Sequence, residues 1–268
     1  MSVMDVGVLG PLCARFGNVD LVSRAQQQRQ VFALLSIAAG RMVRVSDMCS
    51  ELWDGEPPSS ALTVIQTHVV GLRKRLARAM GRSMREISNE VLVTQPGGYT
   101  LNLDPAVVDA HRFETLYRLG SRALADGQAD AAARHLADAL ALWRGPVLAD
   151  LRTGPMLELD VTRLTLAQQV ATEQRIAADL ELGRHYEVLA ELADLTARNP
   201  LDETLHQHYM LALHRTGRRT QALKVYQRLR TLLASDLGLE PGRAMQRVHQ
   251  GILRADVALD RTGQLVAG

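Results

Sequence analysis

The sequence predicts two successive domains, an α+β winged helix-turn-helix in residues 1–104 and an all-α, tetratricopeptide-like helical repeat domain in residues 105–258, with a tail at 259–268. The first prediction depends on an amphipathic helix with a basic end that precedes a glycine-rich hairpin. The second depends on glycines that recur at a fixed spacing. A length of 268 residues is enough for two domains of ordinary size.

Positive charge is concentrated in one short segment. Residues 1–104 contain 11 Lys and Arg against 9 Asp and Glu, whereas residues 105–268 contain 20 of each sign. Six of those 11 cations lie between positions 73 and 85. Because the net charge of the whole chain is only +2, the positive field is local, and it indicates a single binding face.

Several classes of protein are disfavoured by what the sequence lacks. Cys13 and Cys49 are too few for a disulfide framework and lack ligand spacing. No signal peptide and no membrane-length apolar run is evident, so we expect a cytoplasmic, nucleoid-associated protein. Phosphate-binding, hydrolase and zinc-protease motifs are missing. His206, His208 and His214 are interpreted as packing or solvated histidines, and we expect no enzyme activity, cofactor or metal.

The first hundred residues alternate between short strands and helices. Apolar runs separated by Gly and Pro predict strands, helical periodicity predicts three helices, and paired prolines predict a loop. The expected elements are strands at 3–9, 12–16 and 19–22, a helix at 26–39 ended by Gly40, a helix capped by Ser46, a loop at 54–58, a long helix capped by Ser59 or Ser60, and a hairpin at 91–103. This order is typical of a winged helix-turn-helix preceded by a small sheet.

The long helix has two different sides. An apolar stripe is formed by Leu62, Ile65, Val69, Leu72, Leu76 and Ala79. The opposite side is formed by Thr63, Thr67, Val70, Gly71, Lys74 and Arg78, with Gln66 between the two. Along the helix, small side chains therefore come first and cations follow. In a helix that lies in a major groove, small side chains can contact base edges and cations can contact phosphates. The alternative is a solvated basic helix that binds nothing.

Base-facing and phosphate-facing residues follow from this arrangement. We expect the base-facing set to be Thr63, Gln66, Thr67, Val70 and Gly71. Lys74 and Arg78 are expected on phosphates because they point away from the core. Arg73 and Arg75 flank the buried stripe, so they reach phosphates or form contacts within the domain. Tyr99 packs under the hairpin or offers its hydroxyl to a phosphate.

Residues 105–258 contain a recurring pattern of glycine, then a small apolar residue five positions later, then a larger one four positions after that. The three matches are Gly127, Ala132 and Leu136; Gly183, Val188 and Leu192; and Gly217, Ala222 and Tyr226. Gly183 and Gly217 are 34 residues apart, which is the tetratricopeptide period, and Gly127 and Gly183 are 56 residues apart. The excess of 22 predicts an insertion that contains residues 143–151. The alternative is a generic helical bundle.

The motifs resemble those of a known family. The N-terminal part resembles the DNA-binding domain of OmpR-type response regulators and, more closely, that of the Streptomyces antibiotic regulatory protein family. The C-terminal part resembles the bacterial transcriptional activator domain of the same family. The residues that carry the resemblance are those at 9–12, 45–46, 52–55, 57–58, 66–69, 72–74, 96–99, 109, 112–114, 142–145, 199–201, 203, 226–230 and 237–242.

The sequence departs from the family at three places. The helix at 26–39 lacks the usual basic opening after a proline, although Arg24 and Arg29 remain as candidate phosphate contacts. Val70 and Gly71 stand where relatives often have polar or Arg residues. Gly71 either permits close approach to DNA or is simply tolerated, at a cost of about 1 kcal/mol against Ala. Residues 84–90 add length between the long helix and the hairpin, so how far the hairpin extends toward DNA is left open.

The resemblance implies a transcription activator for a specialised-metabolite gene cluster, and no cofactor. Such a protein binds double-stranded promoter DNA at direct repeats near the −35 element, as two protomers side by side. It recruits RNA polymerase through the sigma and alpha subunits, and the loop formed by Asp54, Gly55, Glu56, Pro57 and Pro58 touches the polymerase. One alternative is a protein-interaction scaffold whose winged helix no longer binds DNA. A ligand-sensing regulator is another.

Overall fold

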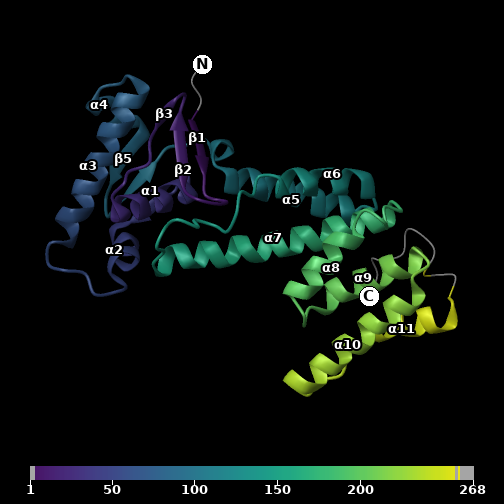
Figure 1. Cartoon of the computed structure of the whole chain (residues 1–268). Helices are drawn as coiled ribbons and strands as arrows, with labels where there is room; N and C mark the ends of the chain where they lie inside the picture. The colour runs from purple at the N-terminus through teal and green to yellow at the C-terminus, as the bar shows by residue number, and fades with distance from the viewer. Residues whose placement is uncertain (1–3, 257–258, 260–268) are drawn as a thin grey trace. The chain divides into compact units, whose positions relative to one another are not determined.

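The computed structural model describes residues 4–256 and Leu259, so most of the expected tail at 259–268 lies outside the described residues. The chain packs as two compact units, one formed by Met1–Leu116 with Asp138–Gln169 and the other by Tyr117–Ala137 with Val170–Gly268. These units do not coincide with the expected domains at 1–104 and 105–258, and that division stays a prediction. Residues 105–116 and 138–169 pack with the N-terminal unit, and Figure 1 shows the course of the chain.

The first unit contains two small antiparallel sheets. One has the order β1-β2-β3, formed by Met4–Gly7, Cys13–Phe16 and Val19–Asp20. The other has the order β4-β6-β5, formed by Met42–Arg44, Gly98–Leu101 and Leu92–Gln95. The expected hairpin is therefore present as β5 and β6. The strand β4, between α1 and α2, pairs with β6 and makes the hairpin part of a three-stranded sheet.

Three helices follow the first sheet and agree closely with the expected positions. They are α1 (Gln26–Ala38), α2 (Val45–Trp53) and α3 (Ala61–Met80). Two expected caps differ. The N-cap of α2 is Arg44, so Ser46 lies inside the helix, where its hydroxyl bonds Asp47. Ser60 is the N-cap of α3, but its side chain makes no capping bond.

The inward side of α3 is the apolar stripe with one correction. Ile65, Val69, Leu72 and Leu76 are each at most 2% exposed. Leu62 is 51% exposed, and its neighbour Ala61 is buried in its place. The buried positions step by four, four, three and four from residue 61. Position 62 is rotated from position 61 by one residue, about 100° around the helix axis, so its side chain points away from the core.

The added length between α3 and the hairpin is folded. It forms the short helix α4 (Met84–Glu86) and a π-helical turn, η1 (Ile87–Val91). Ser83 and Glu86 cap each other at the start of α4. Ile87 and Val91 are buried, so this segment adds to the core next to the hairpin.

The remaining chain is helical apart from the 3-10 turn η2 (Pro105–Val107). The helices are α5 (Asp109–Ala125), α6 (Ala129–Leu140), α7 (Pro155–Glu181), α8 (Leu189–Arg198), α9 (Glu203–Arg215), α10 (Arg219–Leu237) and α11 (Arg243–Arg254). In the part of the chain that the structure describes, no helix is both long and apolar enough to cross a membrane.

The three glycines of the repeated pattern each stand between two helices. Gly127, Gly183 and Gly217 have φ of 71°, 78° and 77°, a left-handed conformation that glycine adopts without strain. The small residue of each match is at most 2% exposed. Each small residue is thus buried just after its turn, as the pattern predicted. Assignment to the tetratricopeptide class stays a prediction.

Candidate nucleic-acid interface

The outward side of α3 presents small and amide side chains in its first half. Thr63, Gln66 and Thr67 are exposed, and Val70 is 40% exposed. The Thr67 hydroxyl donates to the Thr63 carbonyl at 2.8 Å. Because that bond occupies the only hydroxyl hydrogen of Thr67, its oxygen and its methyl group are what a ligand can meet.

The second half of the same side is cationic. Lys74, Arg75 and Arg78 are exposed, and no ion pair joins them to a carboxylate among residues 4–256. They line a groove of about 400 Å³ together with Val19, Asp20, Gln28 and Gly71. We call the seven residues Thr63, Gln66, Thr67, Val70, Lys74, Arg75 and Arg78 the contact face.

Gly71 differs from the other expected base-facing residues because it lies against α1. A Cβ atom added at Gly71 would stand 2.2 Å from Gln28 Nε2. That nitrogen donates to the His68 carbonyl at 3.0 Å, and the amide oxygen of neighbouring Gln27 lies 3.4 Å from His68 Nε2. The absence of a side chain at position 71 thus allows α1 to dock on α3, and we leave Gly71 out of the contact face.

Three expected phosphate contacts are engaged inside the first unit. Arg73 donates through Nε and Nη2 to the Leu92 carbonyl at 2.9 and 2.7 Å, and Nη2 also reaches Thr94 Oγ1 at 2.8 Å. Arg73 therefore fastens α3 to the first strand of the hairpin. Tyr99 is only 6% exposed and packs beneath the hairpin.

The two arginines near the start of α1 differ from each other. The guanidinium of Arg29 forms an ion pair with Asp150, and its side chain is 16% exposed. Arg24 is exposed without an ion-pair partner among the described residues. Only Arg24 keeps the geometry expected of a phosphate contact.

The loop from Asp54 to Pro58 is exposed throughout. Asp54 and Gly55 have φ of 51° and 89°, so the chain turns sharply as α2 ends. The loop therefore presents two carboxylates and two prolines to the solvent, beside the start of α3.

A buried carboxylate that the sequence pattern did not reveal joins α2 to α7. Glu51 is 2% exposed. Its oxygens accept from the Gly154 and Leu157 amides at 2.6 and 2.9 Å, and Gln30 Nε2 donates to it at 3.2 Å. A carboxylate in this position satisfies the free N–H groups at the start of α7. The sequence signal that could have indicated a helix start here is Pro155, which stands at the first position of α7.

A second buried carboxylate, Asp109, joins the start of α5 to the first sheet. Its oxygens accept from the Val8 and Leu9 amides at 2.8 and 3.1 Å, and Arg144 donates to it at 3.3 Å. Arg144 also lies against Gly10, where an added Cβ would stand 2.9 Å from the Arg144 Cβ. We call the two buried carboxylates Glu51 and Asp109, together with Arg144, which pairs with Asp109 and is itself exposed, the buried joint.

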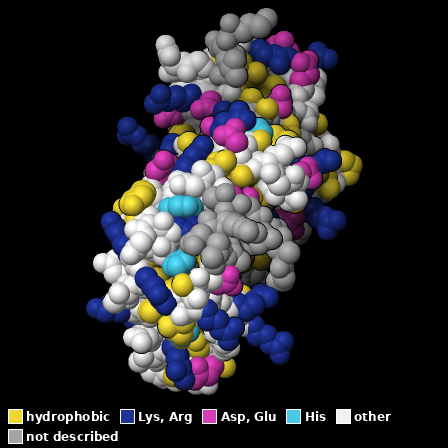
Figure 2. Space-filling model, turned by 90° about the vertical axis from the view of Figure 1, so that its right-hand side faces the viewer, with side chains coloured by type: hydrophobic (Ala, Val, Ile, Leu, Met, Phe, Trp, Pro, Cys, Tyr) yellow, Lys and Arg dark blue, Asp and Glu magenta, His cyan; other side chains and the backbone are white. Residues whose placement is uncertain are grey.

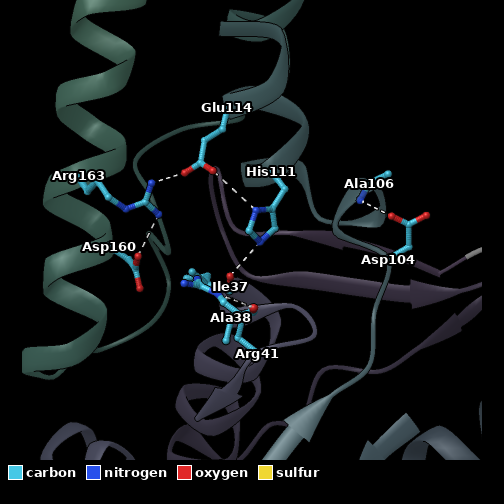
Figure 3. Close-up of polar contacts among 9 residues, drawn as sticks. All are labelled: Ile37, Ala38, Arg41, Asp104, Ala106, His111, Glu114, Asp160 and Arg163. Carbon is cyan, nitrogen blue, oxygen red and sulfur yellow. Dashed lines mark hydrogen bonds and ion pairs between the residues drawn. The ribbon is translucent and has the colours of Figure 1, made fainter. Parts of the chain in front are cut away.

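Phe113, Glu114 and Trp143, which also carried the family resemblance, make further contacts within the first unit. The rings of Phe113 and Trp143 meet edge to face with centroids 5.3 Å apart. Figure 3 shows His111 between the Ile37 carbonyl, at 2.9 Å, and Glu114, at 3.7 Å, with Arg163 on the far side of Glu114. The hydrogen bond from His111 to Glu114 raises the pKa of His111 and lowers that of Glu114 to about 2, the latter helped by Arg163.

Titratable clusters of the second unit offer no metal site. Among the described residues, no group of three or more His, Cys, Asp or Glu could hold a metal ion. The Nδ1 atom of His206 lies 2.7 Å from the Asp202 carbonyl. His208 is 8% exposed, and burial lowers its pKa to about 4. His206 and His208 are therefore packing residues.

Comparison with known proteins decides the family. Residues 108–253 match the family model described as bacterial transcriptional activator domain. The regulatory protein DnrI of Streptomyces peucetius is 41% identical over 260 residues, which are 97% of this chain and 96% of DnrI. The chain belongs to the Streptomyces antibiotic regulatory protein family of transcription regulators.

Other members of the family extend the comparison to a solved structure. The transcriptional regulator RedD of Streptomyces coelicolor is 33% identical, over 96% of this chain and 72% of RedD. The structure of Mycobacterium tuberculosis EmbR in complex with a low affinity phosphopeptide matches with a TM-score of 0.87 and 36% identity, over 95% of this chain and 66% of that one. These findings confirm the predicted family and a mostly helical chain with a small N-terminal β region.

Proposed function

We propose that the chain activates transcription by binding promoter DNA through α3, with the hairpin β5–β6 beside it. One observation carries this proposal: the contact face places four small or amide side chains and then three unpaired cations on one exposed side of a helix whose other side is buried. Bases are read by short groups and the register is fixed on phosphates by cations, which matches this order.

The contact face consists of one set of residues for bases and one for phosphates. Thr63, Gln66, Thr67 and Val70 meet base edges, where a methyl group can pack on thymine and an amide can pair with adenine. Lys74, Arg75 and Arg78 meet phosphates, and exposed Arg24 adds a further contact. Arg73 positions the hairpin and does not itself meet DNA in this proposal.

The wider activity follows from the family. We propose direct repeats near the −35 element, occupied by two protomers, and recruitment of RNA polymerase through its sigma and alpha subunits. The exposed loop at 54–58 is the proposed polymerase contact. A specialised-metabolite gene cluster is the proposed target, which agrees with the regulatory names of DnrI and RedD.

A gel-shift titration over a series of salt concentrations tests the facing assignment. The probe is intergenic DNA next to the gene that contains short direct repeats, and a scrambled duplex is the reference. Lys74→Ala is expected to weaken binding to both duplexes and to reduce the salt slope by about one. Thr67→Ala is expected to change the preference at one base position by about 1 kcal/mol and to leave the slope unchanged.

Arg122→Ala is the matched control, because Arg122 lies in the other unit and its side chain is 84% exposed. It removes one positive charge and is expected to leave affinity and slope as they are. If wild-type protein does not distinguish the repeat from the scrambled duplex, the proposal is wrong and an interaction scaffold is the better description. Gly71 no longer supports that alternative, since its contact with Gln28 accounts for it.

A further inference from the structure

The outward side of α11 carries a second row of cations. Arg243, Arg247 and Arg254 are exposed, and Gln250 lies between the last two. Positions 243, 247, 250 and 254 are spaced by four, three and four, so they share one side of the helix. Met245, Val248 and Ile252, on the other side, are at most 6% exposed and join the core of the second unit.

These three arginines lack the partners that other arginines of the second unit have. Ion pairs with carboxylates are formed there by Arg134, Arg175, Arg184, Arg198 and Arg230. None joins Arg243, Arg247 or Arg254 to a carboxylate among residues 4–256. The Glu203 carboxylate, at the start of α11, accepts from the Gly242 amide at 2.6 Å. Within the described part of the chain, the three arginines of this row are therefore unpaired.

A further arginine lies at the C-terminal end of α11. Arg219, at the start of α10, donates to the Leu253 carbonyl at 3.0 Å and so lies over the C-terminal end of α11. Figure 2 views the molecule from the right-hand side of Figure 1, where α11 is drawn. On the face shown, dark blue Lys and Arg side chains are spread over the surface with magenta carboxylates among them.

The composition of this surface favours a phosphate backbone over a protein. Protein interfaces are centred on apolar and aromatic side chains, whereas interfaces with nucleic acid are polar, cationic and wet. Between the arginines lie Ala244, Gln246 and Gln250, and the ring of His249 is stacked on Tyr226 with centroids 3.8 Å apart. From residue 243 to residue 254 the helix rises about 16 Å, over which one strand of B-DNA presents about five phosphates.

We infer that the outward side of α11 is a second surface for duplex DNA, one that contacts phosphates and does not read bases. The inference extends the proposed function, because it gives the activator domain a contact with nucleic acid of its own. The polar groups of this surface are guanidinium and amide groups, and Ala244 and the half-exposed Leu253 flank them. We therefore expect its affinity to depend on salt and not on base sequence.

The test removes the cations of the contact face and measures the DNA binding that remains. The full chain with Lys74→Ala, Arg75→Ala and Arg78→Ala is titrated against a non-specific duplex of about 40 base pairs, with fluorescence anisotropy read at several salt concentrations. Adding Arg243→Gln, Arg247→Gln and Arg254→Gln is expected to weaken the remaining binding at least tenfold at low salt. The salt slope is expected to fall by about two to three, at about 0.9 per phosphate contact.

The matched control adds Arg122→Gln, Arg134→Gln and Arg198→Gln to the same background. These side chains are 84%, 71% and 73% exposed, so the control removes the same charge from other helices of the same unit. It is expected to change affinity less than twofold. Circular dichroism melting checks that all variants are folded, and exposed substitutions of this kind are expected to keep stability within about 0.5 kcal/mol.

Three outcomes would overturn the inference: equal losses in the α11 variant and the control, no loss in either, or unchanged DNA binding with weakened binding to purified RNA polymerase. The last would make the surface a protein contact. A wild-type chain that selects no promoter sequence, yet shows the α11-dependent salt slope, would overturn the proposed function and uphold this inference. Intact promoter selection without an effect of the α11 substitutions would uphold the proposed function and overturn this inference.

Discussion

The contact face and the buried joint both contain charged residues of the first unit, but these residues are exposed in one and engaged in internal bonds in the other. Lys74, Arg75 and Arg78 are exposed and unpaired, whereas Glu51 and Asp109 are each 2% exposed, and all their bonds are internal. A buried charge without partners would be costly, so the joint is satisfied by backbone amides and an arginine. The difference separates residues available to a ligand from residues that hold the fold.

Changing the buried joint is expected to give the largest effect on stability. Glu51→Ala leaves the Gly154 and Leu157 amides at the start of α7 without an acceptor. We expect the free energy of unfolding to fall by about 3 kcal/mol, since each unsatisfied buried donor costs about 1–3 kcal/mol. Urea unfolding measures this loss, and base preference should stay unchanged in the fraction that remains folded.

Glu56→Ala, in the exposed loop after α2, is the control for Glu51→Ala. It also removes one carboxylate but is expected to change stability by less than about 0.5 kcal/mol. Equal stability of the two variants would show that Glu51 does not cap α7. The distinction between residues that hold the fold and residues available to a ligand would then be wrong for Glu51.

A smaller effect is expected where α1 meets α3, between the two regions. Gly71→Ala gains about 1 kcal/mol of helix propensity but displaces the Gln28 amide from the His68 carbonyl. We therefore expect little net change in stability from Gly71→Ala alone. In a Gln28→Ala background the obstacle is gone, and the same substitution should stabilise the chain by about 1 kcal/mol. A double-mutant cycle measures this coupling.

A coupling near zero in that cycle would mean that Gln28 moves aside freely. Gly71 would then return to the contact face as a position for close approach to DNA. Lys74→Ala supplies the contrast, because its side chain is exposed and it should show no coupling to Gln28.

The contact face could be predicted from sequence, and most of the joint could not. Periodicity fixes which side of a helix is buried, so Thr67, Lys74 and Arg78 were assigned outward from local information alone. Asp109 and Arg144 were noticed only because the family shares them. Their contacts join positions about 35 and 100 apart in the chain, and no local pattern encodes such pairs.

Long-range contacts also explain why some expected DNA contacts stand outside the contact face. The sequence left Arg73 between a phosphate contact and a contact within the domain, and it placed Gly71 on the outward side of the helix. Their neighbours, Leu92 in the hairpin and Gln28 in α1, are distant in sequence and could not be paired with them in advance. Arg29 was a candidate phosphate contact, and its partner Asp150 lies in the expected insertion.

The smallest expected effect concerns pH, at the edge of the joint. The pKa of His111 is raised by its hydrogen bond to Glu114, with a further contribution from the Ile37 carbonyl, while burial and Arg41 oppose the rise. A raised folded-state pKa means that protonation stabilises the fold below the unfolded pKa of about 6.5, and that this stability is lost as pH rises through the folded-state value.

Wild-type protein and His111→Gln are compared by urea unfolding at pH 6 and pH 8. The variant can still donate to the Ile37 carbonyl but carries no charge, so the wild-type advantage should be larger at pH 6, by less than about 1 kcal/mol. Other histidines titrate equally in both proteins and cancel. In a Glu114→Gln background the wild-type advantage at pH 6 over pH 8 should become smaller, because the largest cause of the raised pKa is gone while the Ile37 carbonyl remains. An unchanged difference there would show that Glu114 is not the main cause.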